Sequence, residues 1–181
     1  MMTTELRCTC GALRLELRGA PIVVAECHCA SCRDARRRMA ALPGAPAVVG
    51  AHGGTHFVLY RKDRIRITAG RDRLRHFRLG PQAETRRVIA SCCTMPVLLE
   101  FKGGHWASLY GNLWPAEALP AIDLHTMTSD RGATAPPLAD GVPAGRWATA
   151  KFFAALLAAW IAMGFRAPPL ALDTPEIAIA G

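Results

Sequence analysis

The chain has 181 residues, of which 51% are hydrophobic and 20% are charged. This length suits one well-buried domain, and the balance of apolar and charged residues excludes a disordered chain. The formal net charge of +8, carried almost wholly by arginine, suits an anionic ligand without identifying one.

The N-terminal segment, MMTTELRCTC, has neither an apolar stretch nor a small-residue cleavage site of the secretory kind. We therefore expect a cytoplasmic protein. Stable disulfides are rare in a reducing cytoplasm, so the seven cysteines need another explanation.

Short strand-like runs recur through the first two thirds of the chain. In residues 6–19, leucines alternate with charged residues, as is typical of a half-buried strand. Pro96 is expected to separate the last two runs, and a short helix is predicted over 33–42. The spacing of the runs predicts a mainly β fold. The other runs cover residues 20–29, 55–70, 72–80, 85–93 and 97–103.

The character of the chain changes after about residue 115. Residues 129–145 are rich in proline, glycine and alanine and are typical of a linker. Residues 146–165 predict an apolar helix, but its uncharged part is shorter than the roughly 20 residues that cross a membrane. We expect no membrane span. The helix is expected to pack on the core or on a second subunit, with contact to a membrane surface as the alternative, and an extended tail follows.

The seven cysteines fall into three short groups. Cysteines one residue apart on a strand face the same side, and a two-residue spacing is that of metal-binding knuckles. Sulfurs that share a zinc ion lie roughly 3.8 Å apart, which these spacings allow after a slight turn. The pattern therefore predicts metal binding, with zinc as the expected metal; small buried cysteines and an iron–sulfur cluster are the alternatives. The groups are Cys8 and Cys10; Cys27, Cys29 and Cys32; and Cys92 and Cys93.

With these motifs the sequence resembles the glutathione-dependent formaldehyde-activating enzyme family. The resemblance covers roughly residues 5–115 and rests on CTCG at 8–11, CHCASC at 27–32 and a later cysteine motif on a strand. It implies a β-tent zinc fold, shared with the centromere protein V group, over residues 1–120. Residues 121–181 would then form a C-terminal extension. GGTHF, ITAG and CCTMP are similar to an uncharacterised bacterial side branch of the family.

The resemblance implies two zinc ions, or at least one. A closed structural site would use the first and last cysteine groups, and an open catalytic site would use the middle group. The structural ligands would be Cys8, Cys10 and Cys92, and the catalytic ones Cys27, Cys29 and Cys32.

The sequence departs from the family pattern at the fourth structural ligand. The family's cysteine would fall at position 95, where this chain has Met95, and a thioether is a poor zinc ligand. We expect Cys93 to supply the sulfur, which requires the backbone to turn at Cys92–Cys93. A three-ligand site completed by histidine or water is the alternative.

Four thiolates would give a closed centre, whereas three would leave one position free and a net charge of −1. A substrate thiol entering that position would lose its proton and become a nucleophile. The arginines at 33, 36, 37 and 38 could offset this charge or attract a carboxylate-bearing ligand such as glutathione. We single out Arg33, because it adjoins a ligand, and interpret the others as a solvated helix face.

The histidines and the arginine-rich strands are weaker candidates. His28 lies between two ligands and is expected to point away from the metal. His52 and His56 flank a Gly-Gly pair and are expected in a surface loop, although either could complete an open site. Alternate arginines on a strand could follow a phosphate backbone, but aromatic residues do not interleave with them, so nucleic acid is not expected as a partner.

The leading hypothesis is a cytoplasmic zinc protein that binds glutathione or another small thiol at the open site and forms or cleaves a carbon–sulfur bond. The resemblance implies a carbon–sulfur lyase reaction, the joining of glutathione and formaldehyde to give S-hydroxymethylglutathione. The rival is a non-catalytic zinc-binding scaffold module for protein or nucleic-acid contacts. A dithiol redox device at Cys92–Cys93 is a third hypothesis. Independently of these three hypotheses, the apolar run of the C-terminal helix suggests a homodimer contact.

Overall fold

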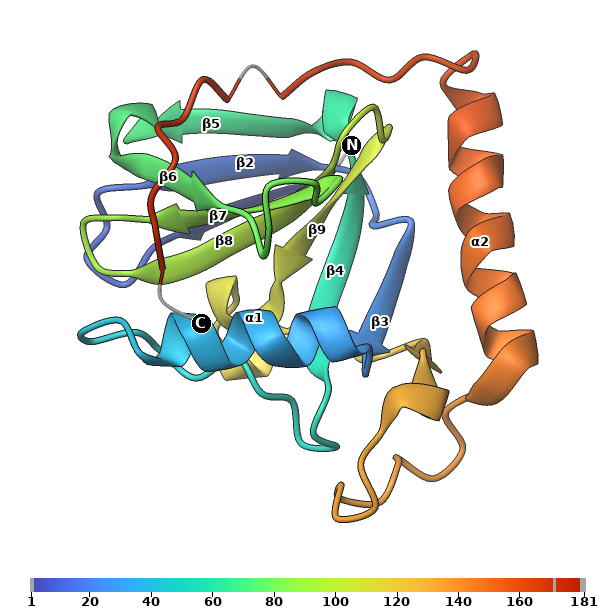
Figure 1. The fold of residues 1–181 in the computed structure, drawn as a ribbon. Helices are drawn as coiled ribbons and strands as arrows, with labels where there is room; N and C mark the ends of the chain where they lie inside the picture. Colours follow the sequence, from blue (N-terminus) through green and yellow to red (C-terminus); the bar gives the residue numbers. More distant parts are fainter. Residues whose placement is uncertain (1, 171, 180–181) are drawn as a thin grey trace.

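Ten strands form two sheets in the computed structural model, which describes residues 2–170 and 172–179 (Figure 1). The predicted mainly β fold with a C-terminal helix is therefore confirmed. The strands are β1 (Thr3–Arg7), β2 (Arg14–Arg18), β3 (Val23–Cys27), β4 (Thr55–Arg61), β5 (Ile65–Ala69), β6 (Leu74–Phe77), β7 (Thr85–Ala90), β8 (Met95–Phe101), β9 (Trp106–Tyr110) and β10 (Leu124–Thr126).

The smaller sheet has three antiparallel strands in the order β1-β2-β5. Leu15 and Leu17 of β2 are buried, whereas Arg14 and Arg18 on the other face are exposed. This is the two-faced strand that the leucine–charge alternation predicts.

The larger sheet is the middle of three layers. Its order is β10-β3-β4-β9-β8-β7-β6, with β10 parallel to β3 and the other pairs antiparallel. Val58 of β4 packs in one apolar cluster with the leucines of β2. Its neighbour Phe57 packs in a second cluster with Ala35 and Met39 of helix α1 (Ala30–Ala40). Since both faces of the sheet are covered, its strands are buried nearly throughout.

Helix α1 begins at the cysteines. Cys29 is its N-terminal cap, and the Cys29 sulfur accepts a hydrogen bond from the backbone nitrogen of Cys32 at 3.3 Å. Cys32, Ala35 and Met39 form its buried stripe, a spacing that suits one helix face. The cysteine motif is thus fixed between the end of a buried strand and the first turn of a packed helix.

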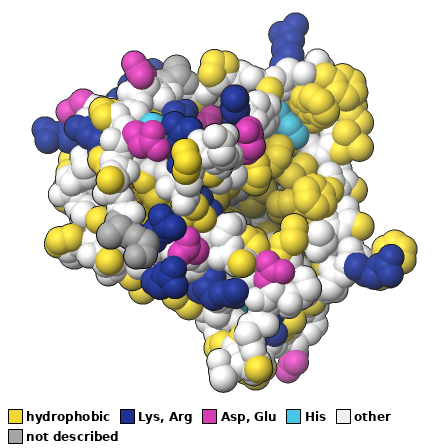
Figure 2. Space-filling model, viewed as in Figure 1, with side chains coloured by type: hydrophobic (Ala, Val, Ile, Leu, Met, Phe, Trp, Pro, Cys, Tyr) yellow, Lys and Arg dark blue, Asp and Glu magenta, His cyan; other side chains and the backbone are white. Residues whose placement is uncertain are grey.

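Helix α2 (Gly145–Ala162) lies along one side of the molecule (Figure 1) and contacts β10. Within it only Ala148 and Leu156 are buried, while Trp147 is 78% exposed and Ile161 54% exposed. Figure 2 shows hydrophobic side chains gathered on this side of the molecule. The helix therefore packs on the core along one narrow face. No helix in the described part of the chain is long and apolar enough to cross a membrane.

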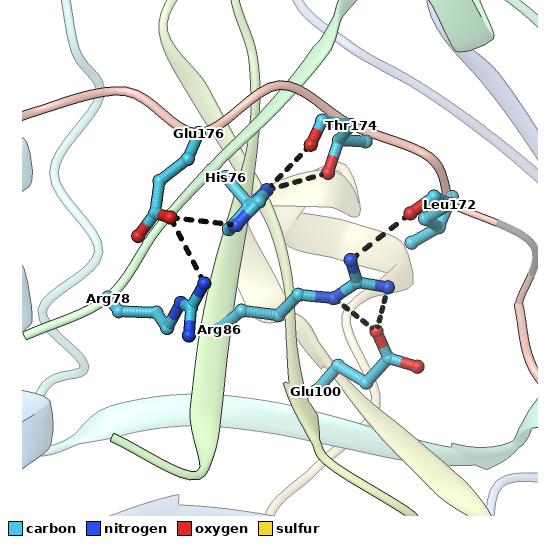
Figure 3. Close-up of polar contacts among 7 residues, drawn as sticks. All are labelled: His76, Arg78, Arg86, Glu100, Leu172, Thr174 and Glu176. Atoms are coloured by element: carbon cyan, nitrogen blue, oxygen red, sulfur yellow. Dashed lines mark hydrogen bonds and ion pairs between the residues drawn. The ribbon is translucent and has the colours of Figure 1, made fainter. Parts of the chain in front are cut away.

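The C-terminal tail crosses the edge strand β6 (Figure 3). Glu176 forms a parallel bridge with His76, whose Nδ1 lies 2.9 Å from both the carbonyl and the hydroxyl oxygen of Thr174. Arg86 donates to the Leu172 carbonyl at 3.1 Å. The tail thereby covers an edge whose backbone groups would otherwise be unpaired. Positions 171, 180 and 181 of the predicted tail lie outside the described residues, as does residue 1.

Pro96 does not separate two strands, as the sequence suggested. It lies inside β8 opposite Ile89, next to a shift in the register between β7 and β8. An irregularity of this kind tolerates the proline, which has no backbone N–H to give to the ladder. The chain reverses instead at residues 91–94, where Thr94 has a φ of 54°. The division of the chain at residue 120 stays a prediction.

Candidate metal centres and the adjoining cavity

The middle cysteine group forms a compact cluster of three sulfurs. Cys27 ends β3, Cys29 caps α1 and Cys32 lies in the first helical turn. The Cys32 sulfur lies 3.7 Å from that of Cys27, and all three sulfurs lie within 4.8 Å of one another. A tetrahedral zinc ion with bonds of about 2.3 Å requires sulfurs roughly 3.8 Å apart. The residues present therefore fit such an ion.

The ionisation of this cluster is strongly asymmetric. Hydrogen bonds from Cys27 and Cys32 lower the pKa of Cys29. Hydrogen bonds with its two neighbours, together with burial, raise the pKa of Cys32, and the hydrogen bond with Cys29 raises that of Cys27. Three neighbouring thiolates repel one another unless a cation lies between them. A divalent metal is the kind of group that would allow all three to ionise.

Arg87 is a buried cation directly behind the cluster. It is 1% exposed and donates to the carbonyl of Ser31, between Cys29 and Cys32. Among the described residues it has no carboxylate partner within ion-pair distance, and its Nε atom has no hydrogen-bond partner. A buried charge needs compensation, and a metal with three thiolates would supply one negative charge.

A cavity of about 380 Å³ opens beside Cys27 and Cys29. Three of its lining residues are arginines, namely Arg33, Arg36 and Arg131. Arg33 comes from α1 and donates to the Asp130 carbonyl at 2.8 Å, so the segment after β10 closes the cavity. The cavity thus joins sulfur donors to positive charge.

Only part of the arginine run lies at this cavity. Arg37 and Arg38 pair with Asp34 at 2.6 Å and 3.0 Å on the same helix, as a solvated helix face would. Arg36, by contrast, lines the cavity and donates to the Gly54 carbonyl at 3.1 Å. Sequence reasoning singled out Arg33, interpreted Arg36 as part of a solvated helix face and missed Arg131. Arg131 lies in the segment interpreted as a linker, where no local pattern indicated a role.

The first and last cysteine groups meet in a second cluster. The Cys8 sulfur lies 3.5 Å from that of Cys10 and 3.8 Å from that of Cys92, and the Cys92 and Cys93 sulfurs are 4.0 Å apart. All four sulfurs lie within 4.8 Å of one another. The turn that ends at Thr94 allows the adjacent cysteines to face the same point. These distances also fit a tetrahedral zinc ion.

Met95 lies next to the second cluster but has a different role. Its Sδ accepts hydrogen bonds from the backbone nitrogen and the hydroxyl of Thr9, at 3.2 Å and 3.4 Å. The structure therefore brings Cys93 among the other sulfurs, while the Met95 thioether is engaged by Thr9. A larger cavity of about 810 Å³ borders Cys8 and Met95, but no other cysteine lines it.

The histidines named from the sequence lie outside both cysteine clusters. His28 Nε2 lies 3.1 Å from His125 Nδ1. His52 hydrogen-bonds the Pro137 carbonyl at 2.8 Å, and His56 is half-buried in β4. Sequence reasoning missed His125 altogether. It also gave no role to Glu26, whose carboxylate lies 3.5 Å from His125 Nδ1.

Fold and site together define a mainly β protein with two cysteine clusters of metal-binding geometry, one of which borders an arginine-lined cavity. The sequence model of a family described as "Glutathione-dependent formaldehyde-activating enzyme" matches residues 3–110, which is more than half of the chain. The chain belongs to this family.

No curated protein matches the sequence. Among solved structures, a Rhodobacter sphaeroides protein determined as a structural-genomics target is 16% identical; the match covers 66% of this chain and 97% of that one, with a TM-score of 0.46.

Proposed function

We propose that the protein binds two zinc ions and uses the one held by Cys27, Cys29 and Cys32 to bind glutathione and join it to formaldehyde. The observation that carries the proposal is the cavity, in which two of the three sulfurs meet three arginines. Glutathione carries one thiol and two carboxylates. Its thiol would approach the sulfur cluster while its carboxylates pair with guanidinium groups, which bind carboxylates well.

In this reaction the glutathione sulfur bonds to the aldehyde carbon, and the electron pair of the carbonyl π bond moves to the oxygen, which takes up the proton lost by the thiol and becomes a hydroxyl. Zinc, when bound, would supply a Lewis acid that lowers the pKa of the incoming thiol. The protein's own residues would orient the substrate: Arg33, Arg36 and Arg131 hold the carboxylates. Because Cys32 is buried, with the buried Arg87 behind the cluster, a substrate would reach the sulfurs from the cavity.

The second cluster is proposed as a structural zinc site of Cys8, Cys10, Cys92 and Cys93. It joins the turn after β1 to the β7–β8 turn, and these two turns are distant in sequence. Four sulfurs complete the tetrahedron, so no position remains for a substrate. Zinc binding there would contribute directly to folding. Since the seven free thiols must stay reduced for both sites, the proposal includes a reducing, cytoplasmic location.

Glutathione binding to zinc-loaded protein, measured by titration calorimetry, tests the proposal. S-methylglutathione, whose sulfur cannot ionise, should bind at least about 10-fold more weakly. Cys32→Ser should lose one zinc and the binding of glutathione. Arg33→Ala should weaken binding, whereas Arg37→Ala, which alters an exposed arginine outside the cavity, should not.

Equal binding of both glutathione forms would contradict a thiol–metal contact. A zinc-loaded chain that binds neither would support the scaffold module instead. Formation of S-hydroxymethylglutathione is then followed by NMR with ¹³C-labelled formaldehyde. A rate no higher with protein than without it would refute the enzymatic part of the proposal.

We also propose that the exposed face of α2 is covered by a second copy of the chain. The helix carries apolar residues on all of its faces, which is typical of helices that are buried on several sides. Leu157→Glu, at a residue that is 51% exposed, should give a monomer in light scattering if the wild type is a dimer through this face. A wild-type monomer at all concentrations would contradict the proposal.

A further inference from the structure

The motif Glu26-Cys27-His28-Cys29 places two kinds of ligand on two sides of one strand end. Cys27 and Cys29 face α1 and form the sulfur cluster. Glu26 alternates with Cys27 on β3 and faces away from the sulfurs, and His28, which also lines the arginine-rich cavity, directs its Nε2 toward His125. There the side chains meet His125, and all three are at most 5% exposed. The same four residues thus contribute to two separate groups of ligand atoms.

His125 comes from the parallel pairing of β10 with β3. Its Cα is the direct partner of that of Glu26, although the two residues are far apart in sequence. The backbone nitrogen of His28 donates to the carbonyl of Thr126 at 3.0 Å, which extends the pairing by one step. The three side chains are therefore held by paired strands and not by a mobile loop, as a preorganised site requires.

The ligand atoms have the spacing of a shared metal ion. His125 Nδ1 lies 3.1 Å from His28 Nε2 and 3.5 Å from a carboxylate oxygen of Glu26. Nitrogen and oxygen ligands at bond lengths of about 2.0–2.2 Å around a tetrahedral ion lie roughly 3.4 Å apart. One candidate ligand atom from each of the three residues lies within 4.8 Å of the others.

The surroundings orient the carboxylate toward the histidines. Glu26 Oε1 accepts a hydrogen bond from the backbone nitrogen of Gly54 at 2.8 Å, which leaves Oε2 facing His125. Gly50 and Gly54 lie so close that an added Cβ would meet Glu26 at 2.5 Å and 2.6 Å. Partners that hold a ligand in place in this way are typical of metal sites. This contact also explains both glycines.

Hydrogen bonding within the protein satisfies these groups only in part. His28 Nε2 and His125 Nδ1 lie within hydrogen-bond distance of each other, so one of them carries a proton unless a cation takes its place. His125 is fully buried, and its Nε2 has no hydrogen-bond partner among the described residues. Among the described residues, Glu26 forms no ion pair with an arginine or a lysine, although Arg36 and Arg131 lie near this cluster. An unpaired buried nitrogen such as His125 Nε2 is rare.

We propose that Glu26, His28 and His125 bind a third divalent transition-metal ion, separate from the two cysteine clusters. Two imidazole nitrogens and one carboxylate oxygen favour zinc, iron(II) or cobalt(II) over calcium or magnesium. The site goes beyond the proposed glutathione chemistry and does not depend on it.

Titration of the metal-free, reduced chain with Co²⁺ tests the proposal. Cobalt bound to thiolates gives intense sulfur-to-metal absorption in the near ultraviolet, and cobalt bound to nitrogen and oxygen does not. We expect total binding, measured by equilibrium dialysis, to exceed by one equivalent the binding at which the sulfur absorption saturates. If the two saturate together in the wild-type chain, the third site does not exist. The sulfur absorption reports the cysteine clusters separately, so their failure would be recognised as such.

Two variants assign the extra equivalent to these residues. His125→Gln and Glu26→Gln should each bind one equivalent less and keep the sulfur absorption unchanged. His105→Gln is the matched control, because His105 is also buried but hydrogen-bonds the Leu156 carbonyl far from this site. Loss of one equivalent in the control, or no loss in both site variants, would overturn the assignment. The wild-type titration decides the question even if a variant fails to fold.

Discussion

Arg87 donates a hydrogen bond from Nη2 to the carbonyl oxygen of Ser31 at 3.3 Å, so a fully buried guanidinium supports the backbone between two cysteines of the three-sulfur cluster. Nothing in the sequence around TRRVIA distinguishes this arginine from its half-buried neighbour Arg86. Its burial becomes understandable if the cluster carries a negative charge, because opposite charges in a low-dielectric interior attract strongly.

Arg87→Met is therefore expected to have opposite effects on the two states of the protein. In metal-free protein it removes an uncompensated buried charge, so the free energy of unfolding should rise, by about 1–4 kcal/mol. In zinc-loaded protein the three-sulfur site should lose about 10- to 100-fold in zinc affinity. Urea unfolding and competition with a chromophoric chelator measure the two effects. Destabilisation of the metal-free chain would show that Arg87 acts by packing alone.

Cys93→Ser and Met95→Leu distinguish the fourth ligand of the second cluster. The Cys93 sulfur lies among the other three, whereas Met95 Sδ accepts hydrogen bonds from Thr9. Cys93→Ser should lower the zinc affinity of this site by more than about 100-fold, because the loss of a ligand exceeds that of an outer partner. Met95→Leu should keep the zinc. The opposite pattern, measured by metal content after dialysis, would make the thioether the ligand.

Glu100 compensates a buried lysine, and it also binds Arg86, which holds the tail; the second contact is drawn in Figure 3. Its carboxylate lies 2.6 Å from Lys62 Nζ and 2.6 Å from Arg86. Glu100→Gln leaves Lys62 buried without its counter-charge and should cost about 3–5 kcal/mol of unfolding free energy. Glu176→Gln, at a half-exposed ion pair, should cost less than about 1 kcal/mol. Similar losses in the two variants would refute this ranking of the two ion pairs.

Because His105 is buried, we expect the protein to lose stability in mild acid. It donates from Nε2 to the Leu156 carbonyl and stacks on Trp160, which attaches α2 to the sheet. Burial lowers its pKa below the ordinary value of 6.5. The unfolded chain therefore takes up a proton more readily, and the stabilisation is complete above pH 6.5 and is lost as the pH falls below it.

Urea unfolding at pH 7.5 and 5.5 measures this contribution. Because burial also lowers the pKa of His28, His56 and His125, the wild type should lose stability over this interval from several sources. His105→Gln should lose less than the wild type, by up to about 1.4 kcal/mol. An unchanged pH dependence would show that His105 does not contribute.

Local patterns predicted most of the strands and both helices. Alternation over 6–19 indicated β2, and the apolar run at 146–165 predicted α2, which occupies Gly145–Ala162. The grouping of cysteines indicated the three-sulfur cluster, whose members are neighbours in sequence, whereas the joining of the first and last groups followed from the family resemblance. Family membership is confirmed over residues 3–110, whereas the bound metals and the reaction stay predictions.

The parts that sequence reasoning missed depend on contacts between distant segments. His125 reaches Glu26 only because a three-residue strand pairs in parallel with β3, and so short a strand has no detectable period. Arg131 lines the cavity from an irregular segment. Arg87 is buried because the start of α1, a segment distant in sequence, packs against it. The available signal was the alternation of Glu26 and His28 with the cysteines, which predicts ligands on both sides of the strand.

A crystal structure of the zinc-loaded protein with glutathione, with anomalous data collected at the zinc edge, tests the central claim most directly. We predict an anomalous peak roughly 2.3 Å from the sulfurs of Cys27, Cys29 and Cys32, with the glutathione sulfur as the fourth ligand and its carboxylates beside the cavity arginines. The claim is contradicted if no peak lies among these three sulfurs, or if a protein side chain occupies the fourth position.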